Sequence, residues 1–252
     1  MPVILSGSGK GGVGKTCVTG GIAWALSQYG RVGVTDLDVR GPDITYLLGI
    51  LHEATTDPGY NLWMPAAAPL DGHEVTAFSP RMWFGDGTGV MAPDTQVQSF
   101  IREMLFRVDW NRFGPITRMV IDMDPSSGAS LDAISSMMSN VRAVVVTTSD
   151  RTSIEDCTRF VDSCRAKGVH PAGVIGNKVG PVCPSCHTPL KCGSCHTDIH
   201  YGDEDTIRAF AQRTGLPYLG SLPWSPEFQT DPIGAITGIG RQLFTSVAEA
   251  LR

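Results

Sequence analysis

The glycine-rich segment from Gly9 to Thr16 is the part of the chain whose residue types and spacing point most directly to chemistry. It reads Gly-Lys-Gly-Gly-Val-Gly-Lys-Thr and satisfies the phosphate-loop pattern GxxxxGK[ST]. Glycines let the backbone curl so that its N–H groups point at phosphate oxygens, and the N-terminus of a following helix adds positive potential. Lys15 can then reach the β- and γ-phosphates of a nucleotide, and the Thr16 hydroxyl can bind Mg²⁺.

A second glycine motif overlaps this segment. Residues Gly7 to Gly12 fit the dinucleotide-binding pattern GxGxxG, and Asp36 lies at a suitable sequence distance to contact a ribose. The dinucleotide pattern needs no Lys-Thr pair at the start of the helix, whereas a phosphate loop does, so the phosphate loop is favoured. The nucleotide-binding residues expected from this segment are Gly9, Lys10, Gly11, Gly12, Val13, Gly14, Lys15, Thr16 and Cys17.

Two aspartates follow apolar runs that are typical of strands. Asp38 comes just after residues 31–35, and Asp122 comes directly after residues 119–121. Sites of α/β proteins form at the carboxyl ends of parallel strands, where a carboxylate can orient an attacking water or hold Mg²⁺. We therefore expect Asp38 to position water and Asp122 to support the Mg²⁺ shell together with Thr16.

Four of the seven cysteines are concentrated in one short segment with the pattern CxxC-x5-CxxC. A CxxC turn lets two thiolates converge on one metal, and cysteines that only pack would be scattered through apolar segments, as Cys17, Cys157 and Cys164 are. Thiolates suit both Zn²⁺ and iron–sulfur clusters, although the two pairs of a zinc ribbon are usually separated by roughly 15–20 residues. The sequence predicts a metal site and leaves the metal open; its expected ligands are Cys183, Cys186, Cys192 and Cys195.

Alternating strand and helix patterns must position these residues. Apolar, β-branched runs indicate strands at residues 3–5, 31–35, 119–121, 143–147, 172–177 and 218–222. Helical patterns lie at residues 15–29, 95–106, 130–139, 153–167, 203–214 and 240–252. This alternation predicts an α/β fold of three layers, the P-loop NTPase fold, with a mostly parallel sheet and helices on both faces.

The chain of 252 residues is long enough for one domain of this kind, and no linker composition divides it. We therefore expect a single P-loop ATPase domain over residues 1–252, with an inserted cysteine-rich metal-binding loop at 180–202. Residues 51–115 are interpreted as an elaborated crossover. No repeat or low-complexity tract is apparent along the chain.

The composition of the chain restricts the kinds of partner that we expect it to bind. The net charge is −5 and no run of Lys or Arg is present, which argues against a nucleic-acid partner. No stretch approaches the roughly 18 apolar residues of a membrane span, and the N-terminus lacks the pattern of a signal peptide. The expected location is the cytoplasm, where thiols stay reduced, and the odd number of cysteines does not indicate a disulfide framework.

A lysine placed ahead of the usual phosphate-loop lysine, here Lys10, resembles the deviant phosphate-loop ATPases of the MinD/ParA/nitrogenase-iron-protein class. In that class the early lysine reaches across a dimer to the phosphates bound by the partner. The resemblance therefore implies a homodimer that closes around ATP.

Further segments resemble the Mrp-like (ApbC-like) iron–sulfur cluster carrier ATPases. Asp36–Ile44 is similar to the DxDxxGPSxP stretch of that family, and Gly220–Pro223 is similar to its late G-x-[IV]-P strand end. Val108–Trp110 followed by Met119–Asp122 is similar to its VDWG…DYLIIDxPPG segment. The chain departs from the family at residues 124–129, where PPGTGD, the second switch, is replaced by Asp-Pro-Ser-Ser-Gly-Ala.

The resemblance also implies roles for residues near the C-terminal half of the sheet. Asn177 stands where the family contacts adenine, and Pro223 is assigned to the nucleotide site with it. Cys183 and Cys186 match a single CPxC that meets its copy in the dimer and bridges a 4Fe–4S cluster. The second CxxC pair is an addition, which could complete a four-thiolate site within each subunit, zinc or iron, or form a site from which a cluster is passed on.

Taken with the resemblance, the residues imply an ATP-binding and hydrolysing homodimer that carries an iron–sulfur cluster to apo-proteins. The alternatives are a MinD/ParA-like ATPase or a nickel-insertion-type ATPase with structural zinc at the four cysteines. A MinD/ParA-like organiser would need a basic DNA-binding face or a cationic amphipathic tail, and only Arg241 and Arg252 are basic in the C-terminal helix.

Overall fold

The structure is a computed structural model of the chain. It describes residues 1–39, 41–50, 54–85, 93–124, 128–183, 185–199 and 201–252. Three segments singled out in the sequence are therefore only partly covered, because Arg40, residues 125–127 of the second switch and Pro184 lie outside the described residues.

Eight strands form one sheet in the order β3-β4-β2-β5-β1-β6-β7-β8. Every neighbouring pair is parallel except β3 with β4. Strands β1 and β2 are buried along their whole length, which is why their apolar runs are continuous and do not alternate. The strands are β1 (Val3–Gly7), β2 (Val32–Asp36), β3 (Ala66–Leu70), β4 (His73–Phe78), β5 (Arg118–Asp122), β6 (Val141–Thr147), β7 (His170–Gly176) and β8 (Tyr218–Ser221).

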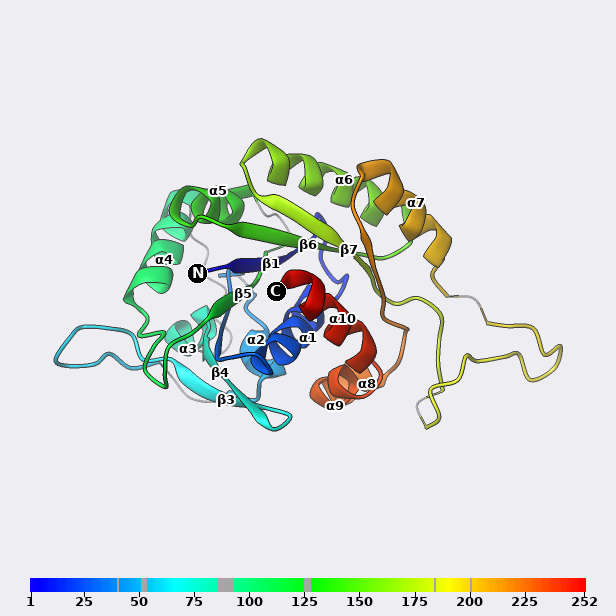
Figure 1. Cartoon of the computed structure of the whole chain (residues 1–252), viewed down its shortest axis with the longest axis horizontal. Helices are drawn as coiled ribbons and strands as arrows, with labels where there is room; N and C mark the ends of the chain where they lie inside the picture. Colours follow the sequence, from blue (N-terminus) through cyan, green and yellow to red (C-terminus); the bar gives the residue numbers. More distant parts are fainter. Residues whose placement is uncertain (40, 51–53, 86–92, 125–127, 184, 200) are drawn as a thin grey trace.

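Helices cover both faces of this sheet, which completes the three predicted layers. Figure 1 shows α4, α5, α6 and α7 along one face, with α1 and α10 against the other. The helices are α1 (Lys15–Ser27), α2 (Ile44–Leu47), α3 (Pro80–Phe84), α4 (Asp94–Arg107), α5 (Gly128–Met137), α6 (Arg151–Ala166), α7 (Glu204–Thr214), α8 (Glu227–Thr230), α9 (Pro232–Thr237) and α10 (Arg241–Leu251).

The C-terminal helix α10 packs on α1. Phe244, Val247 and Leu251 are buried. A Cβ added at Gly21 of α1 would lie 2.2 Å from the Phe244 ring, so the two helices approach each other closely. This packing holds α1 in place, and with it the site at its N-terminus. No helix in the described ranges is both long and apolar enough to cross a membrane.

The hairpin β3–β4 was missed in the sequence, where residues 51–115 are interpreted as a crossover with one helix. That helix is confirmed as α4. The hairpin turns at Asp71 and Gly72, which both have positive φ (46° and 80°), as a tight two-residue turn requires. The Asp-Gly pair between two partly apolar runs was the available signal. Strand β4 pairs in parallel with β2, so the hairpin extends the sheet at its edge.

The order of the strands determines where a ligand site is expected in this fold. Strand β1 lies between β5 and β6. The strand that follows β1 in the chain, β2, lies on one side of it, and β6 to β8 lie on the other side. Ligands bind at such a switch point, outside the carboxyl ends of the strands. The register pairs Ser6 of β1 and Asp36 of β2 with Asp122 of β5. The phosphate loop and both acidic strand ends therefore meet at one edge.

Candidate functional site

The phosphate loop joins β1 to α1, and its glycines have backbone conformations that require them. Gly12 and Gly14 have φ of 74° and 92°, in the left-handed region that other residues rarely adopt. A Cβ at Gly14 would also lie 2.0 Å from Asn177 Nδ2. Glycine is required at position 9 for a different reason. A Cβ there would lie 2.3 Å from the Asp156 carbonyl oxygen of α6.

A cavity of about 340 Å³ opens at the N-terminus of α1, within the range of ~300–1,000 Å³ usual for small-molecule sites. Nine of the predicted nucleotide and Mg²⁺ residues line it: Gly12, Gly14, Lys15, Thr16, Cys17, Asp38, Asp122, Asn177 and Pro223. It is also lined by residues that sequence reasoning missed, notably Lys178 and Trp224. The predicted Lys10, Gly11 and Val13 instead line a second cavity of about 370 Å³, together with Lys178 and Tyr201.

Thr16 and Asp122 are brought together as expected for a Mg²⁺ site. The Thr16 hydroxyl donates to Asp122 Oδ2 at 2.5 Å, and the Thr19 hydroxyl donates to Oδ1 at 3.2 Å. Burial raises the pKa of Asp122 to about 6, although these hydrogen bonds and the Lys15 charge act in the opposite direction. A hydroxyl and a carboxylate are oxygen ligands that suit Mg²⁺, so the residues present fit that ion.

Replacing Asp122 by Asn should stabilise the nucleotide-free protein at pH 8 and weaken its response to Mg²⁺. Because the pKa of Asp122 in the folded protein lies above the ordinary value, the buried charge lowers the free energy of unfolding progressively from about pH 4 and by its full amount above about pH 6. The penalty, on the order of 2 kcal/mol, fades as the carboxyl protonates at lower pH, and Asn never incurs it. Thermal unfolding in EDTA should show the variant a few degrees more stable at pH 8 and less so at pH 5. An equal gain at both pH values would contradict this explanation.

Asp38 and Asp36 have different positions although they end the same strand. Asp38 lines the nucleotide cavity and its Oδ1 accepts from the Gly41 amide at 2.9 Å. Asp36 is fully buried and accepts from the Ile44 amide at 3.0 Å and the Ser79 hydroxyl at 3.2 Å. Burial raises the pKa of Asp36 well above its usual range. Asp36 therefore holds the segment that carries Asp38, and it cannot face the ribose that the dinucleotide pattern would require.

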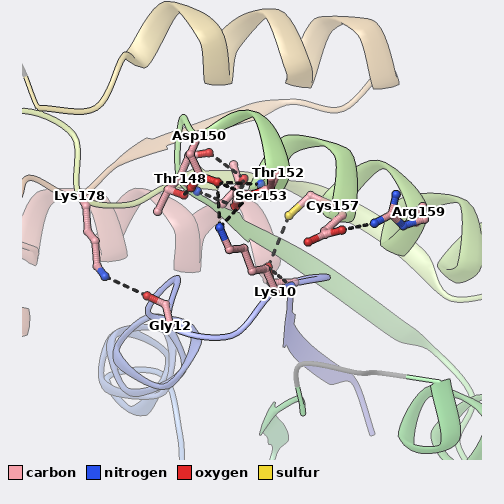
Figure 2. Close-up of polar contacts among 12 residues, drawn as sticks. Lys10, Gly12, Thr148, Asp150, Thr152, Ser153, Cys157, Arg159 and Lys178 are labelled. Atoms are coloured by element: carbon pink, nitrogen blue, oxygen red, sulfur yellow. Dashed lines mark hydrogen bonds and ion pairs between the residues drawn. The ribbon is translucent and has the colours of Figure 1, made fainter.

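Two neighbouring residues after β7 hold the phosphate loop from the side. Asn177 is buried, its amide nitrogen donates to the Val13 carbonyl at 2.7 Å, and its oxygen accepts from the Lys178 amide at 2.9 Å. The Lys178 ammonium donates to the Gly12 carbonyl at 2.9 Å (Figure 2). Lys178 thus touches the loop and the nucleotide cavity, a role that no sequence pattern indicated.

Lys10 lies outside the nucleotide cavity, against the start of α6 (Figure 2). Its ammonium donates to Asp150 Oδ1 at 2.9 Å and to the Thr152 hydroxyl at 2.8 Å. Partial burial opposes ionisation of Asp150, but hydrogen bonds from Thr148, Thr152 and Lys10 together lower its pKa below the usual range. Both partners of the ion pair are about half-exposed, and such pairs contribute at most ~1 kcal/mol. Lys10 can therefore exchange this contact for another anion at little cost.

The cysteine segment forms an arm between β7 and α7 that projects from the body of the molecule beside α7 (Figure 1). Its root pairs with the chain after β8: the Trp224 amide donates to the Gly180 carbonyl at 3.0 Å, and the Val182 amide donates to the Trp224 carbonyl at 3.2 Å. Trp224 also lines the nucleotide cavity. One residue therefore borders the cavity and anchors the arm.

The structure brings the arm cysteines together as two pairs. Cys183 hydrogen-bonds Cys186, and Cys192 hydrogen-bonds Cys195. Within the part of the chain that the structure describes, no three Cys, His, Asp or Glu side chains gather as a metal site. Hydrogen bonds from the Thr188 hydroxyl and amide lower the pKa of Cys186. The equivalent bonds from Thr197 lower the pKa of Cys195 to about 7, so this exposed thiol is readily ionised near neutral pH.

The remaining cysteines are of a different kind. Cys157 and Cys164 are buried in α6, as their apolar neighbours predict. Cys17 lies half-buried beside the nucleotide cavity, and burial together with the Asp122 charge raises the pKa of its thiol to about 12. It is therefore a neutral thiol at physiological pH.

Comparisons with known proteins identify the family of the chain. A family model described as "ParA: NUBPL iron-transfer P-loop NTPase" matches residues 1–233. The cytosolic Fe-S cluster assembly factor NUBP2 homolog of Culex quinquefasciatus is 27% identical over 255 residues, which cover 98% of this chain and 91% of that protein. The iron-sulfur cluster carrier protein of Aquifex aeolicus is 30% identical over 227 residues, which cover 89% of this chain and 58% of that protein.

Solved structures confirm the fold. A nucleotide-binding protein in complex with ADP from Archaeoglobus fulgidus has a TM-score of 0.66 at 19% identity, covering 97% of this chain and 87% of that one. The cell division ATPase MinD of Pyrococcus furiosus has a TM-score of 0.62 at 18% identity, covering 99% and 98%. The predicted fold and the family resemblance are therefore confirmed. The chain is a P-loop ATPase that belongs to the ParA/NUBPL family of iron-transfer NTPases.

Proposed function

We propose that this ATPase works as a homodimer that binds an iron–sulfur cluster at its cysteine arm and transfers it to apo-proteins. The observation that carries the proposal is that the thiolate-bearing arm is joined to the wall of the nucleotide cavity. Lys178, at the start of the arm, lines this cavity, and so does Trp224, whose main chain pairs with Gly180 and Val182 of the arm. The names of the relatives, cluster assembly factors and a cluster carrier, support the same cargo. A single ATPase domain with an inserted arm is the organisation that this function needs.

ATP with Mg²⁺ is the proposed nucleotide. Lys15 and the loop amides would hold the phosphates, and Thr16 and Asp122 would hold Mg²⁺, which neutralises the phosphate charge when bound. Asp38 would position the attacking water from its place in the cavity wall. Asn177 and Pro223 would border the base, and Asn177 can both donate to and accept from adenine.

Coupling between nucleotide and cargo requires that the affinity of the protein for ATP differ between two conformations of the arm. The contacts offer two routes. Lys178 connects the Gly12 carbonyl of the loop to the first residues of the arm, and Trp224 connects the cavity wall to the main chain of Gly180 and Val182. A nucleotide that moves Gly12 or Trp224 therefore shifts the arm root.

Replacing Lys10 by Ala should prevent ATP-dependent dimerisation while leaving nucleotide binding nearly unchanged. Lys10 lies outside the nucleotide cavity of its own chain, and its ammonium is held at a half-exposed surface by Asp150 and the Thr152 hydroxyl, contacts that it can exchange for the phosphates bound by a second copy. We expect ATP affinity within about threefold of wild type and a loss of ATPase activity of at least about tenfold, since one lost charge–phosphate contact is worth over ~1.4 kcal/mol. Light scattering with MgATP and with a non-hydrolysable analogue measures the dimer.

The matched control for this variant is Lys167→Ala, which removes another surface lysine with a single acidic partner, Asp132. The control should dimerise like wild type. Dimerisation of the Lys10 variant at wild-type ATP concentrations would contradict the assigned role.

The test of the cargo is the metal content after anaerobic reconstitution with iron and sulfide, with zinc and nickel measured in the same samples. We expect iron and acid-labile sulfide in nearly equal amounts. One zinc per chain without sulfide would instead indicate a zinc-stabilised ATPase, and nickel at the arm would indicate a nickel-insertion role; either result would overturn the carrier proposal.

A further inference from the structure

The cysteine arm consists of a tandem repeat of nine residues. Residues 183–191 read Cys-Pro-Ser-Cys-His-Thr-Pro-Leu-Lys, and residues 192–200 read Cys-Gly-Ser-Cys-His-Thr-Asp-Ile-His, so Cys, Ser, Cys, His and Thr recur at the same five positions. The expectation that the chain has no repeat was therefore wrong at this scale. The two units share only short side chains and a histidine, which escape a search for long repeats.

The described residues of the first unit form a turn that is closed by backbone hydrogen bonds. The Cys183 amide donates to the Thr188 carbonyl at 2.9 Å, and the His187 amide donates to the Cys183 carbonyl at 2.8 Å. His187 has a left-handed φ of 56°. The turn brings Cys186 Sγ within 3.0 Å of the Thr188 hydroxyl, which can donate to the sulfur.

The second unit repeats this geometry. The Cys192 amide donates to the Thr197 carbonyl at 2.8 Å, and the His196 amide donates to the Cys192 carbonyl at 2.9 Å. His196 has a φ of 57°, and Cys195 Sγ lies 2.9 Å from the Thr197 hydroxyl. Every distance agrees with the first turn within 0.1 Å. The two histidines also share a left-handed backbone conformation that is uncommon outside glycine. Both turns are therefore built to hold two sulfurs in the same way.

The two turns belong to separate hairpins. Val182 bridges to Pro189 around the first, and Lys191 bridges to Asp198 around the second. Figure 1 shows the hairpins leaving the arm root in different directions. Four sulfurs around one metal must each lie about 2.3 Å from it. Among the described side chains the four sulfurs do not gather in such a group, so each hairpin carries its own pair.

We propose that the pair Cys192–Cys195 is a metal site of its own, so that each chain presents two separate two-thiolate sites for a soft metal centre. The inference rests on the proposed carrier function and deepens it. In a twofold dimer the same surface of each copy meets at the axis, so each pair completes four thiolates with the same pair of a second copy. A dimer then holds two centres, each bridging the two chains.

The experiment compares the iron and sulfide bound by four full-length proteins after anaerobic reconstitution. These are wild type, Cys183→Ser/Cys186→Ser, Cys192→Ser/Cys195→Ser, and the variant with all four substitutions. Ser185→Ala/Ser194→Ala is the matched control, because it changes one exposed, equivalent residue in each turn and leaves the thiolates intact. Thermal unfolding of the metal-free proteins verifies that all of them fold.

Each double cysteine variant should keep about half of the wild-type iron and sulfide, the quadruple variant none, and the serine control all. Loss of all metal from both double variants would show a single four-thiolate centre and overturn the inference. Unchanged metal in Cys192→Ser/Cys195→Ser would show that the first turn acts alone and would overturn it as well.

A cobalt titration of the same proteins, followed by thiolate-to-metal absorption, repeats the count without sulfide. The cobalt titration separates the second metal site from the carrier function. If each double variant keeps half of the cobalt but the wild-type protein binds no cluster, the two sites are supported and the carrier function is contradicted. Full loss of cobalt from either double variant contradicts the second site, whatever the iron analysis shows.

Discussion

Replacing Lys15 by Met is expected to abolish nucleotide binding and to lower ATP hydrolysis at least about a hundredfold. Lys15 is buried at the N-terminus of α1, in the wall of the nucleotide cavity beside Thr16 and Asp122. Methionine fills a similar volume without the charge, so the fold should persist. A hundredfold loss corresponds to about 2.7 kcal/mol, the scale of one lost electrostatic contact to a phosphate or oxyanion.

The effect should extend to Asp122. The Lys15 charge lowers the pKa of that carboxyl, so its removal favours the protonated form, which cannot bind Mg²⁺. Isothermal titration with MgATP and steady-state hydrolysis measure both losses. Lys167→Ala, outside the site, should behave as wild type. ATP affinity of the Lys15 variant within threefold of wild type would show that the cavity at α1 is not the nucleotide site.

Replacing Asp38 by Asn should affect hydrolysis but not binding. We expect ATP still to bind to this variant, whereas hydrolysis slows at least about a hundredfold. Asp38 faces the cavity, and its carboxylate is oriented by the Gly41 amide and by the buried support of Asp36 below it. Asn keeps the shape and can still accept from Gly41, but it cannot take part as an anion in positioning water. The variant should therefore accumulate as the ATP-bound dimer.

Single-turnover hydrolysis and light scattering measure this outcome together. Asp43→Asn is the matched control, because Asp43 lines the same cavity from the same segment and is not assigned to water. It should retain most of the activity. Hydrolysis by the Asp38 variant near the wild-type rate would remove Asp38 from the mechanism.

The parts of the site that were predictable from sequence are those encoded locally. The left-handed glycines and Lys15 lie within a few residues of one another, so their spacing alone identifies a phosphate loop. Asp122 follows a continuous apolar strand, which places it at the same sheet edge. The hairpin β3–β4 was harder, because Ala66–Leu70 is rich in alanine and contains a proline, both poor indicators of a strand.

The contacts of Lys178 and Trp224 could not be predicted, because each joins segments that are distant in sequence. Lys178 reaches Gly12 across the sheet edge, and Trp224 pairs with Gly180 only once β8 has been added beside β7. No pattern of spacing encodes such pairings. The same limit applies to the arm, where the cysteine spacing identifies thiolate turns but not whether two turns meet. In the structure, the bridges from Val182 and Lys191 place the turns in separate hairpins.

We expect nucleotide occupancy to control the cargo of the arm. The rate of cluster transfer from the reconstituted wild-type protein to an apo-ferredoxin, measured by circular dichroism with and without MgATP, tests this coupling. We expect MgATP to change the rate at least about fivefold, which corresponds to about 1 kcal/mol in the activation free energy of transfer, and to have no effect in the Lys15→Met variant. The same transfer rate with and without MgATP, in a wild-type protein that holds its cluster, would contradict the account.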